Sequence, residues 1–478
     1  MFKKNWLYKL LLPLTLCLSL MLPAFNTNAA LAAEKSTFNP ITASSASEVN
    51  DTYSSSTNGR VLDAGNWAPA TRLAINNLIA KNGKNSPTYK SNKKPYVVFD
   101  WDNTNCYADV EESALIYQLE NLKYKMTPAE FRIAFTSGNN AAIPETNFLD
   151  PYKNEAGQPV NITKVANDVC KDYQFFWDNY RGLNPKATNN MTLAQIKNSD
   201  QLKDFEAKFW FTYSAMDVTF GQDIDYTWAL NFFTGYTPAE VKTLATQAID
   251  YAAGQKIQNV YFDSTLPGET GIIKNSNAAI GNYFRQGLRS TPEMKNLMSS
   301  LRVNGVDVYI CTASLDSVVK GFASTAKYGY NVPDENVIGM HLNVVDKKYV
   351  SAIPDTTTYA INVKQGKAVN INNLLAQKKG YNPILIAGDS DGDYEMMTEL
   401  SGFNNVKKIN DLDPLQMVLI VNRLKGGNIG ALCKIAAGQM GLPNQTIVLQ
   451  GRDEYTGKWV PYESTLKLGK TSYQLVKY

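Results

Sequence analysis

The stretch V-V-F-D-W-D-N-T, residues 97–104, decides the fold of this chain. It is an apolar, β-prone run that ends in two carboxylates, Asp100 and Asp102, two residues apart. Alternate residues of an extended chain point to the same side, so both acids can face one site beyond the C-terminal end of a buried strand, where open α/β sheets bind ligands. The competing interpretation is a plain turn in which an aspartate caps the next helix.

A second stretch of the same kind, P-I-L-I-A-G-D-S-D-G-D, lies at residues 383–393. If the two strand ends meet, their carboxylates form an oxygen-rich pocket. Such a pocket suits Mg²⁺, which takes hard oxygen ligands and usually keeps waters and a substrate phosphate. The two stretches together therefore predict phosphoryl-transfer chemistry, which neither would predict alone.

Four segments in this order resemble the motifs of the phosphoserine phosphatase-like phosphatases in the haloacid dehalogenase (HAD) superfamily. They are D-W-D-N-T at 100–104, V-D-V-Y-I-C-T-A-S at 306–314, G-K at 366–367 and I-L-I-A-G-D-S-D-G-D at 384–393. The resemblance spans about Pro95 to Leu400 and implies a Rossmann-like α/β core with a parallel sheet. In that superfamily the second aspartate of the first motif separates phosphatases from dehalogenases, and Asp102 supplies it here.

The resemblance implies a hydrolysis that passes through an aspartyl phosphate. Asp100 would be the nucleophile, and Asp102 would protonate the leaving alcohol and then deprotonate the attacking water. Thr312 would donate its hydroxyl to a phosphoryl oxygen, with Ser314 as the nearby alternative and as a candidate for substrate binding.

The third and fourth motifs supply the expected charge partners. Lys367 would neutralise the nucleophile and the phosphoryl group, with Lys364 as the competing candidate and an ordinary solvated lysine as the other interpretation. A Mg²⁺ cofactor would be held by the side chains of Asp100 and Asp389 and by the backbone carbonyl of Asp102, and Asp393 would act mainly through water or by fixing the coordination shell. Asp391 has the weaker claim, and the spacing does not fit a helix-loop-helix calcium site.

The first motif, with E-E-S following at 111–113, is similar to that of secreted phosphatases that act on phosphorylcholine. The resemblance implies a small-molecule phosphate ester as substrate, with phosphorylcholine as a candidate, and substrate binding by Glu111 or Glu112. Adjacent helix positions diverge by roughly 100°, so at most one of the two can reach the site. An acidic first turn favoured by the helix dipole is the other interpretation.

Residues 1–33 have the pattern of a secretory signal peptide, with three early lysines, an apolar run and a small-residue cleavage site. We therefore expect a secreted or extracytoplasmic protein with no stable membrane span after cleavage. The 478-residue chain has a formal net charge of +3, and cleavage would remove three lysines and no acidic residue. No basic excess remains, so we expect no nucleic-acid partner.

The first and second motifs are about 190 residues apart, far more than a crossover needs, which predicts a separately folded insertion. The expected organisation is a signal peptide at 1–33, a flexible linker at 34–60, a HAD core at 61–105 and 301–425, a mainly helical cap at 106–300 and a C-terminal extension at 426–478. Aromatic clusters of the cap, such as F-W-F at 209–211, predict mostly a helical core, with a minority free to face an organic cation.

The composition excludes several other classes. The single histidine, His341, excludes multi-histidine zinc sites and phosphatases with a histidine nucleophile. Four cysteines beyond the signal are too few for a disulfide scaffold, although one bridge stays open. Two functions remain: a secreted Mg²⁺-dependent phosphomonoesterase, and a non-catalytic secreted binding or surface protein on a HAD fold. A competent residue at every catalytic position favours the first.

Overall fold

The computed structural model describes residues 61–143, 148, 152–275, 283–403 and 406–477. The predicted signal peptide and linker, residues 1–33 and 34–60, lie outside the described residues. Within the described ranges, no helix combines the length and the apolar composition that crossing a membrane requires.

A parallel sheet of six strands forms the centre of the fold, in the order β14-β13-β12-β1-β8-β9. Along the chain these strands are β1 Tyr96–Phe99, β8 Asp307–Leu315, β9 Val337–Met340, β12 Leu385–Gly388, β13 Met417–Val421 and β14 Ile447–Gln450. Strand β1 pairs with both β8 and β12, so the strands of the first, second and fourth motifs are neighbours. The predicted α/β fold with a parallel sheet is confirmed.

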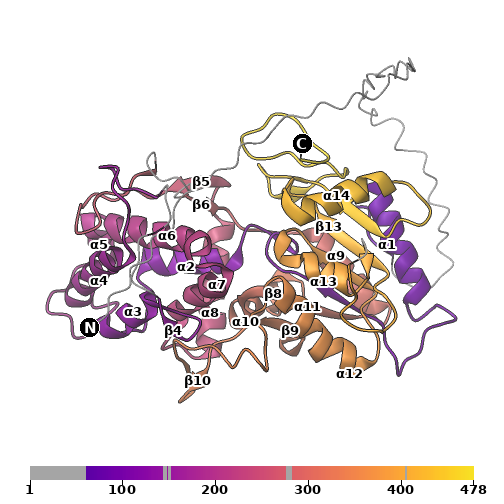
Figure 1. Cartoon of the computed structure of the whole chain (residues 1–478), viewed down its shortest axis with the longest axis horizontal. Helices are drawn as coiled ribbons and strands as arrows, with labels where there is room; N and C mark the ends of the chain where they lie inside the picture. Colours follow the sequence, from indigo (N-terminus) through magenta and orange to yellow (C-terminus); the bar gives the residue numbers. More distant parts are fainter. Residues whose placement is uncertain (1–60, 144–147, 149–151, 276–282, 404–405, 478) are drawn as a thin grey trace, which may run out of the picture. The chain divides into compact units, whose positions relative to one another are not determined.

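Helices cover both faces of the sheet, because both sets of alternating side chains are apolar. Val97 and Phe99 of β1 belong to one buried core, and Tyr96 and Val98 belong to the other. The first core includes residues of α1 (Pro69–Asn82) and α9 (Pro292–Val303), and the second includes residues of α11 (Gln365–Ile371), α13 (Tyr394–Glu399) and α14 (Gly427–Gln439) (Figure 1).

Between β1 and β8 the chain forms a group of helices, coloured purple to magenta in Figure 1. They are α2 Val110–Asn121, α3 Pro128–Phe135, α4 Ile162–Asn179, α5 Leu193–Lys197, α6 Asp200–Phe220, α7 Gln222–Leu230 and α8 Pro238–Ala253. Thr127 and Thr237 begin α3 and α8 with capping boxes, the pattern that their sequences predict. Fully buried rings such as Phe131, Phe209 and Trp228 form the core of this helical cap.

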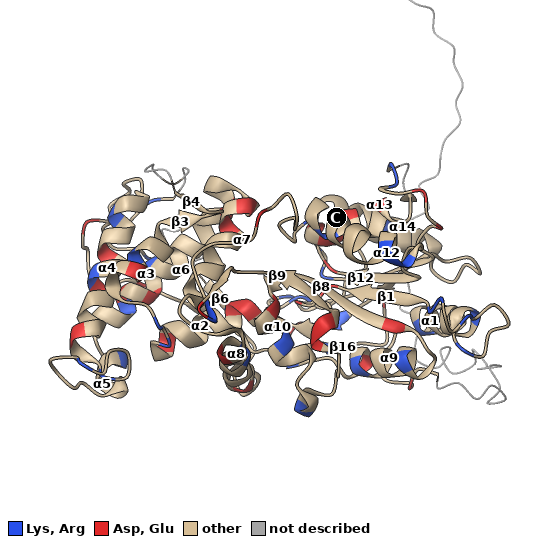
Figure 2. Cartoon of the chain, turned by 90° about the horizontal axis from the view of Figure 1, so that it is seen from below, with Lys and Arg blue, Asp and Glu red and all other residues tan. Residues whose placement is uncertain are grey.

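Two short strands connect the helical cap to the sheet. Strand β2 (Cys106–Tyr107), where the chain leaves the sheet, pairs antiparallel with β7 (Arg289–Ser290), where it returns. Other two-stranded ribbons are β3 Ser137–Gly138 with β4 Ala141–Ala142, β5 Gln258–Tyr261 with β6 Tyr283–Gln286, β10 Val344–Val345 with β11 Lys348–Tyr349, and β15 Arg452–Asp453 with β16 Lys458–Trp459. Two further α-helices are α10 (Asp316–Ala323) and the three-residue α12 (Gln377–Lys379). Acidic and basic residues are interspersed on helices such as α4 and α9 (Figure 2).

The two ends of the described chain meet at the edge of the sheet. Strand β14, which falls within the predicted C-terminal extension, is the edge strand beside β13. Helix α1 packs on it: the Thr71 hydroxyl donates to the Leu449 carbonyl at 2.5 Å, and the Ala68 N–H donates to the Gln450 side chain at 2.8 Å. The sheet is therefore completed by residues from both ends.

Candidate active site

The first motif turns sharply away from the end of β1. The Asp100 N–H still donates to the Ala387 carbonyl of β12 at 2.9 Å, which fixes the backbone there. Its carbonyl accepts from the Asn105 side chain at 2.5 Å, and Asn103 adopts a left-handed φ of 63°. The Asp100 carboxylate is thus held at the carboxyl edge of the sheet, 6% exposed.

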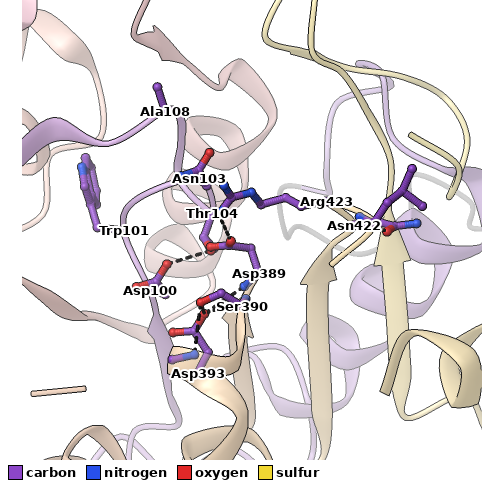
Figure 3. Close-up of polar contacts among 12 residues, drawn as sticks. Asp100, Trp101, Asn103, Thr104, Ala108, Asp389, Ser390, Asp393, Asn422 and Arg423 are labelled. Atoms are coloured by element: carbon purple, nitrogen blue, oxygen red, sulfur yellow. Dashed lines mark hydrogen bonds and ion pairs between the residues drawn. The ribbon is translucent and has the colours of Figure 1, made fainter. Parts of the chain in front are cut away.

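Three carboxylates converge at this edge, as Figure 3 shows: Asp100, Asp389 and Asp393. One oxygen of each lies within 4.8 Å of the others, and all three residues are buried. A Cβ added at Gly388, just before Asp389, would lie 2.6 Å from the Asp393 Cβ, so only glycine lets the strand end pack against that side chain. The two predicted carboxylate stretches therefore do meet.

Lys367 lies between two of these acids. Its ammonium group donates to Asp100 at 2.6 Å and to Asp393 at 2.7 Å, and the residue is 2% exposed. Burial opposes the charge of Lys367, but Asp100 and Asp393 outweigh it and raise its pKa well above the usual value. Lys364, the competing candidate, is exposed.

Burial and the nearby Asp393 raise the pKa of Asp100 well above its usual range, although Lys367 opposes the shift. The Thr104 hydroxyl lies 2.9 Å from Asp100 and 3.0 Å from Asp389, between their carboxylates (Figure 3). A hydroxyl carries one proton and can donate to only one of them at a time. The carboxylate cluster therefore has more negative charge and more acceptor oxygens than its cations and donors satisfy. A hard divalent cation fits such a site.

The three aspartates of the fourth motif make different contacts. Asp389 pairs with the Arg423 guanidinium at 2.5 Å. Asp393 accepts the N–H groups of Asp389 and Ser390 at 3.0 and 3.1 Å, so it shapes the turn. Asp391 lies outside the carboxylate cluster and accepts the Ile429 N–H at 2.7 Å, near the start of α14.

Asp102 lies outside the three-carboxylate cluster but lines the same cavity, where its side chain contacts the second motif. Its carboxylate accepts the Val110 N–H and the Ser314 hydroxyl, each at 2.7 Å. Burial first, then Asp109 and Asp100, raise the pKa of Asp102 well above its usual range. A carboxyl group with a raised pKa can act as an acid near neutral pH, which is what the predicted role requires.

The two hydroxyl residues of the second motif, Thr312 and Ser314, have different environments in the structure. Thr312 is fully buried, lines the cavity at the strand ends, and accepts the Ser314 N–H at 3.1 Å. Asn362 holds the Thr312 carbonyl at 2.6 Å. The Ser314 hydroxyl instead donates to the Asp102 carboxylate, so Ser314 orients that acid.

The acidic pair of α2 also separates. Glu111 is 7% exposed and accepts the Leu315 N–H at 2.6 Å, which ties α2 to the end of β8. Glu112 accepts from the Tyr213 hydroxyl at 3.2 Å and lines a second, adjoining cavity. Burial, the largest cause for each, raises the pKa of each carboxyl to about 8. Of the two predicted substrate-binding residues, Glu112 is the one that faces open space.

The cavity over the carboxylate cluster has a volume of about 440 Å³. Its floor includes the first, second and fourth motifs, and its walls include Gln222 and Tyr226 of α7. Tyr226 is thus an aromatic cap residue that reaches the site, whereas Phe209 and Trp228 are core residues, as the composition predicts for most of them.

The site includes residues that were not predicted from the sequence, among them Thr104, Asp109, Arg423 and Lys425. Arg423 lies two residues after the end of β13, and because parallel strands end at one edge, its place after the apolar run 417–421 could have indicated it. Asp109 caps α2 by accepting the Glu112 N–H at 2.9 Å. Nothing in the spacing of the sequence indicates that Asp109 lies at the site.

The parallel sheet, the ordered motifs and the buried acids with their lysine correspond to the arrangement that the resemblance to HAD-type phosphatases predicts. In sequence the chain is similar to phosphorylcholine phosphatase of Pseudomonas aeruginosa, with 23% identity over 363 residues, which are 71% of this chain and 78% of that protein.

No protein-family model matches the chain. Its fold is similar to the crystal structure of a conserved, functionally unknown protein from Anaerococcus prevotii DSM 20548, with a TM-score of 0.74 and 28% identity. The similarity covers 85% of this chain and 98% of that one, so it extends beyond the motif-bearing core into the helical cap.

Proposed function

We propose that this chain is a Mg²⁺-dependent phosphomonoesterase that works through an aspartyl phosphate on Asp100. The observation that carries the proposal is the convergence of Asp100, Asp389 and Asp393 in one buried cluster, in which Lys367 pairs with Asp100 and Asp393, with a fourth acid, Asp102, on the same cavity. A structural turn has no need of three buried carboxylates at the mouth of a cavity, because burying charge is costly.

In the first step, an oxygen of Asp100 attacks phosphorus and the bond from phosphorus to the ester oxygen breaks. Asp102 transfers its proton to the leaving alkoxide. In the second step, water attacks phosphorus, Asp102 takes its proton, and the bond from phosphorus to Asp100 breaks to release inorganic phosphate. Thr312 and Lys367 orient and neutralise the phosphoryl oxygens in both steps.

Mg²⁺ would be held by the side chains of Asp100 and Asp389 and by the backbone carbonyl of Asp102, and it would supply charge neutralisation at the phosphoryl group. Asp393 fixes the turn that presents Asp389, and it shares Lys367 with Asp100. The donor set of carboxylate and carbonyl oxygens fits this hard cation.

For the substrate we propose a small phosphate ester, and phosphorylcholine is the first compound to test, because the Pseudomonas relative carries that name. The ring of Tyr226 and the carboxyl group of Asp109 line the reaction cavity and are groups that can bind a quaternary ammonium there, whereas Glu112 lines only the adjoining cavity. Release from the cell is proposed on the signal pattern of residues 1–33.

The test is hydrolysis of phosphorylcholine and ethyl phosphate by the purified protein, with and without chelator, followed by restoration with Mg²⁺. Asp100→Asn should lower kcat by about 10⁴-fold or more, because it removes the nucleophile at nearly constant volume. The matched control is Asp307→Asn, a carboxylate at the opposite end of the sheet. Acid quenching during turnover should trap one phosphoryl group on the peptide that contains Asp100.

A non-catalytic protein on the same fold gives a different result. It would bind phosphate esters without hydrolysing them, and Asp100→Asn would leave that behaviour unchanged. Wild-type activity in excess chelator would reject the metal role alone and leave the nucleophile standing.

A further inference from the structure

A second cavity adjoins the reaction cavity on the side of the C-terminal segment. Its volume is about 510 Å³. The two cavities share four lining residues, Asn103, Asp109, Arg423 and Lys425, so a group bound in one can extend toward the other.

Five cationic side chains line this second cavity: Arg285, Arg423, Lys425, Arg452 and Lys467. They come from β6, from the loop after β13 and from the C-terminal segment, so segments far apart in the sequence each contribute positive charge. The acids that line it are Asp109, Glu112 and Glu454. Cations therefore outnumber acids in its wall.

Glu454 is a single carboxylate among three of these cations. It accepts from Arg452 at 3.0 Å and from Lys467 at 3.1 Å, and Arg285 lies 3.7 Å away. The residue is 2% exposed, and although burial opposes ionisation, Arg452 and Lys467 lower its pKa to about 2. One negative charge cannot neutralise three positive ones, so the group keeps a positive excess.

Several donors in the wall have no acceptor. Among the described residues, the buried Nε–H groups of Arg423 and Arg452 donate to nothing, and Lys425, which is exposed, makes no hydrogen bond or ion pair. The two remaining acids are engaged elsewhere, because Asp109 caps α2 and Glu112 accepts from Tyr213. Buried donors are almost always paired in folded proteins, so a ligand with acceptor oxygens would complete the wall.

We propose that this cavity is a second anion site, which binds a phosphate or carboxylate group beside the reaction site. Arg423 and Lys425 lie between the two sites and would contact both groups. The inference rests on the proposed phosphatase function and deepens it. The anion has two possible sources: the leaving-group side of the substrate, or a free oxyanion bound next to the ester.

Kinetics test the first source, with three esters that carry the same transferred phosphoryl group: phosphoglycolate, ethyl phosphate and phosphorylcholine. If the anion belongs to the substrate, kcat/KM for phosphoglycolate should exceed that for ethyl phosphate by roughly tenfold or more, the value of one charge-assisted hydrogen bond. Lys425→Met and Lys467→Met should each reduce that ratio. Lys434→Met, an exposed lysine of α14, is the matched control and should leave it unchanged.

Binding tests the second source. Sulfate should raise the unfolding temperature of the chelated wild-type protein and of Lys434→Met, and it should do so less in Lys425→Met and Lys467→Met. Arg452 is buried, and replacing it could prevent folding. The lysine variants Lys425→Met and Lys467→Met are therefore the ones that test for the anion site.

The inference is overturned if the three esters show no lysine-dependent preference and sulfate protects all variants equally. The proposed function fails separately: a wild-type protein that hydrolyses none of the three esters would reject it, while the sulfate measurement would still show whether the anion site exists.

Discussion

Lys367 is the residue on which the charge balance of the site depends, because it is the cation shared by Asp100 and Asp393. We expect Lys367→Met to lower kcat/KM at least about a thousandfold, about 4 kcal/mol of transition-state stabilisation, since the phosphoryl charge loses its fixed partner. Steady-state kinetics with ethyl phosphate measure this loss. Lys364→Met, at an exposed position three residues earlier, should stay within about threefold of wild type. The reverse order would return the role to Lys364.

Ser314 is expected to act through Asp102 and not on the substrate. Its hydroxyl donates to the Asp102 carboxylate, which favours the ionised form, so removing it should raise the pKa of Asp102 further. Ser314→Ala should lower kcat/KM by about tenfold and move the limb of the pH profile that reports Asp102 to higher pH. Ser314→Thr keeps the hydroxyl and should keep the profile. An unchanged pH profile in Ser314→Ala would contradict this assignment.

Individual site residues could be predicted from the sequence where a strand presents them. Asp100, Asp389 and Lys367 directly follow apolar strands or begin a helix, so the chain's local geometry determines where they point. Arg423 and Thr104 needed the neighbour order of β1, β12 and β13, which is a tertiary property. Glu111 and Glu112 looked equivalent in the sequence, and only the packing of α2 against β8 separates them.

Within the cap, helices α4 and α6 are joined by a buried ionic cluster. Lys208 is fully buried and pairs with Asp168 at 2.9 Å and with Asp204 at 2.8 Å. Asp172 Oδ2 and Asp204 Oδ1 are buried and have no other donor among the described residues, so a proton held by Asp172 would satisfy both. Burial first, and Asp204 second, raise the pKa of Asp172 to about 8.

This raised pKa predicts how the stability of the cap changes with pH. Folded Asp172 keeps its proton up to about pH 8, whereas an unfolded aspartate releases it near pH 4, at a pKa of about 3.9. The folded state therefore binds more protons across that window, and stability falls as the pH rises through it. Asp172→Asn cannot lose a proton. We expect its Tm to fall less than that of wild type between pH 5.5 and 8.5, with each 1 kcal/mol worth about 2–4 °C.

The control for this prediction lies on the same helix. Asp178 is an exposed residue of α4, and Asp178→Asn should reproduce the wild-type dependence of Tm on pH. Parallel curves for wild type and Asp172→Asn would show that no proton is held at the cluster.

The elements of the sheet were more predictable than those of the cap. Strands such as β12 and β13 are short, continuous apolar runs before polar turns, which is the pattern of a strand buried on both faces. The connectors β2 and β7 have two residues each and form only because they pair with one another, so no local pattern indicates them.

At the scale of the whole molecule, the C-terminal segment is part of the fold. Strand β14 covers the edge of β13, and the Asn422 side chain donates to the carbonyls of Glu463 and Leu475 at 2.8 and 2.7 Å. A chain that ends after Gly441 should therefore lose its cooperative thermal transition, because the edge of β13 and the apolar face of α1 become exposed together. Calorimetry measures this. A truncated protein with a wild-type transition would show that the sheet is complete without β14.

The contact between α1 and β14 also determines how late during synthesis the sheet can be completed. Thr71 emerges from the ribosome 378 residues before its partner Leu449. Strand β1 cannot pair with β8 until the whole cap between them has been synthesised. Contacts between such distant residues form late, because the intervening chain has to be closed first. Cap helices such as α4 and α6 pack on one another and can form while the chain is still growing, but α8 packs on α10, and the sheet with its carboxylate edge cannot close until translation has almost ended. A nascent chain interrupted anywhere before β14 thus carries unpaired strands, and its dependence on chaperones should be greatest in that interval.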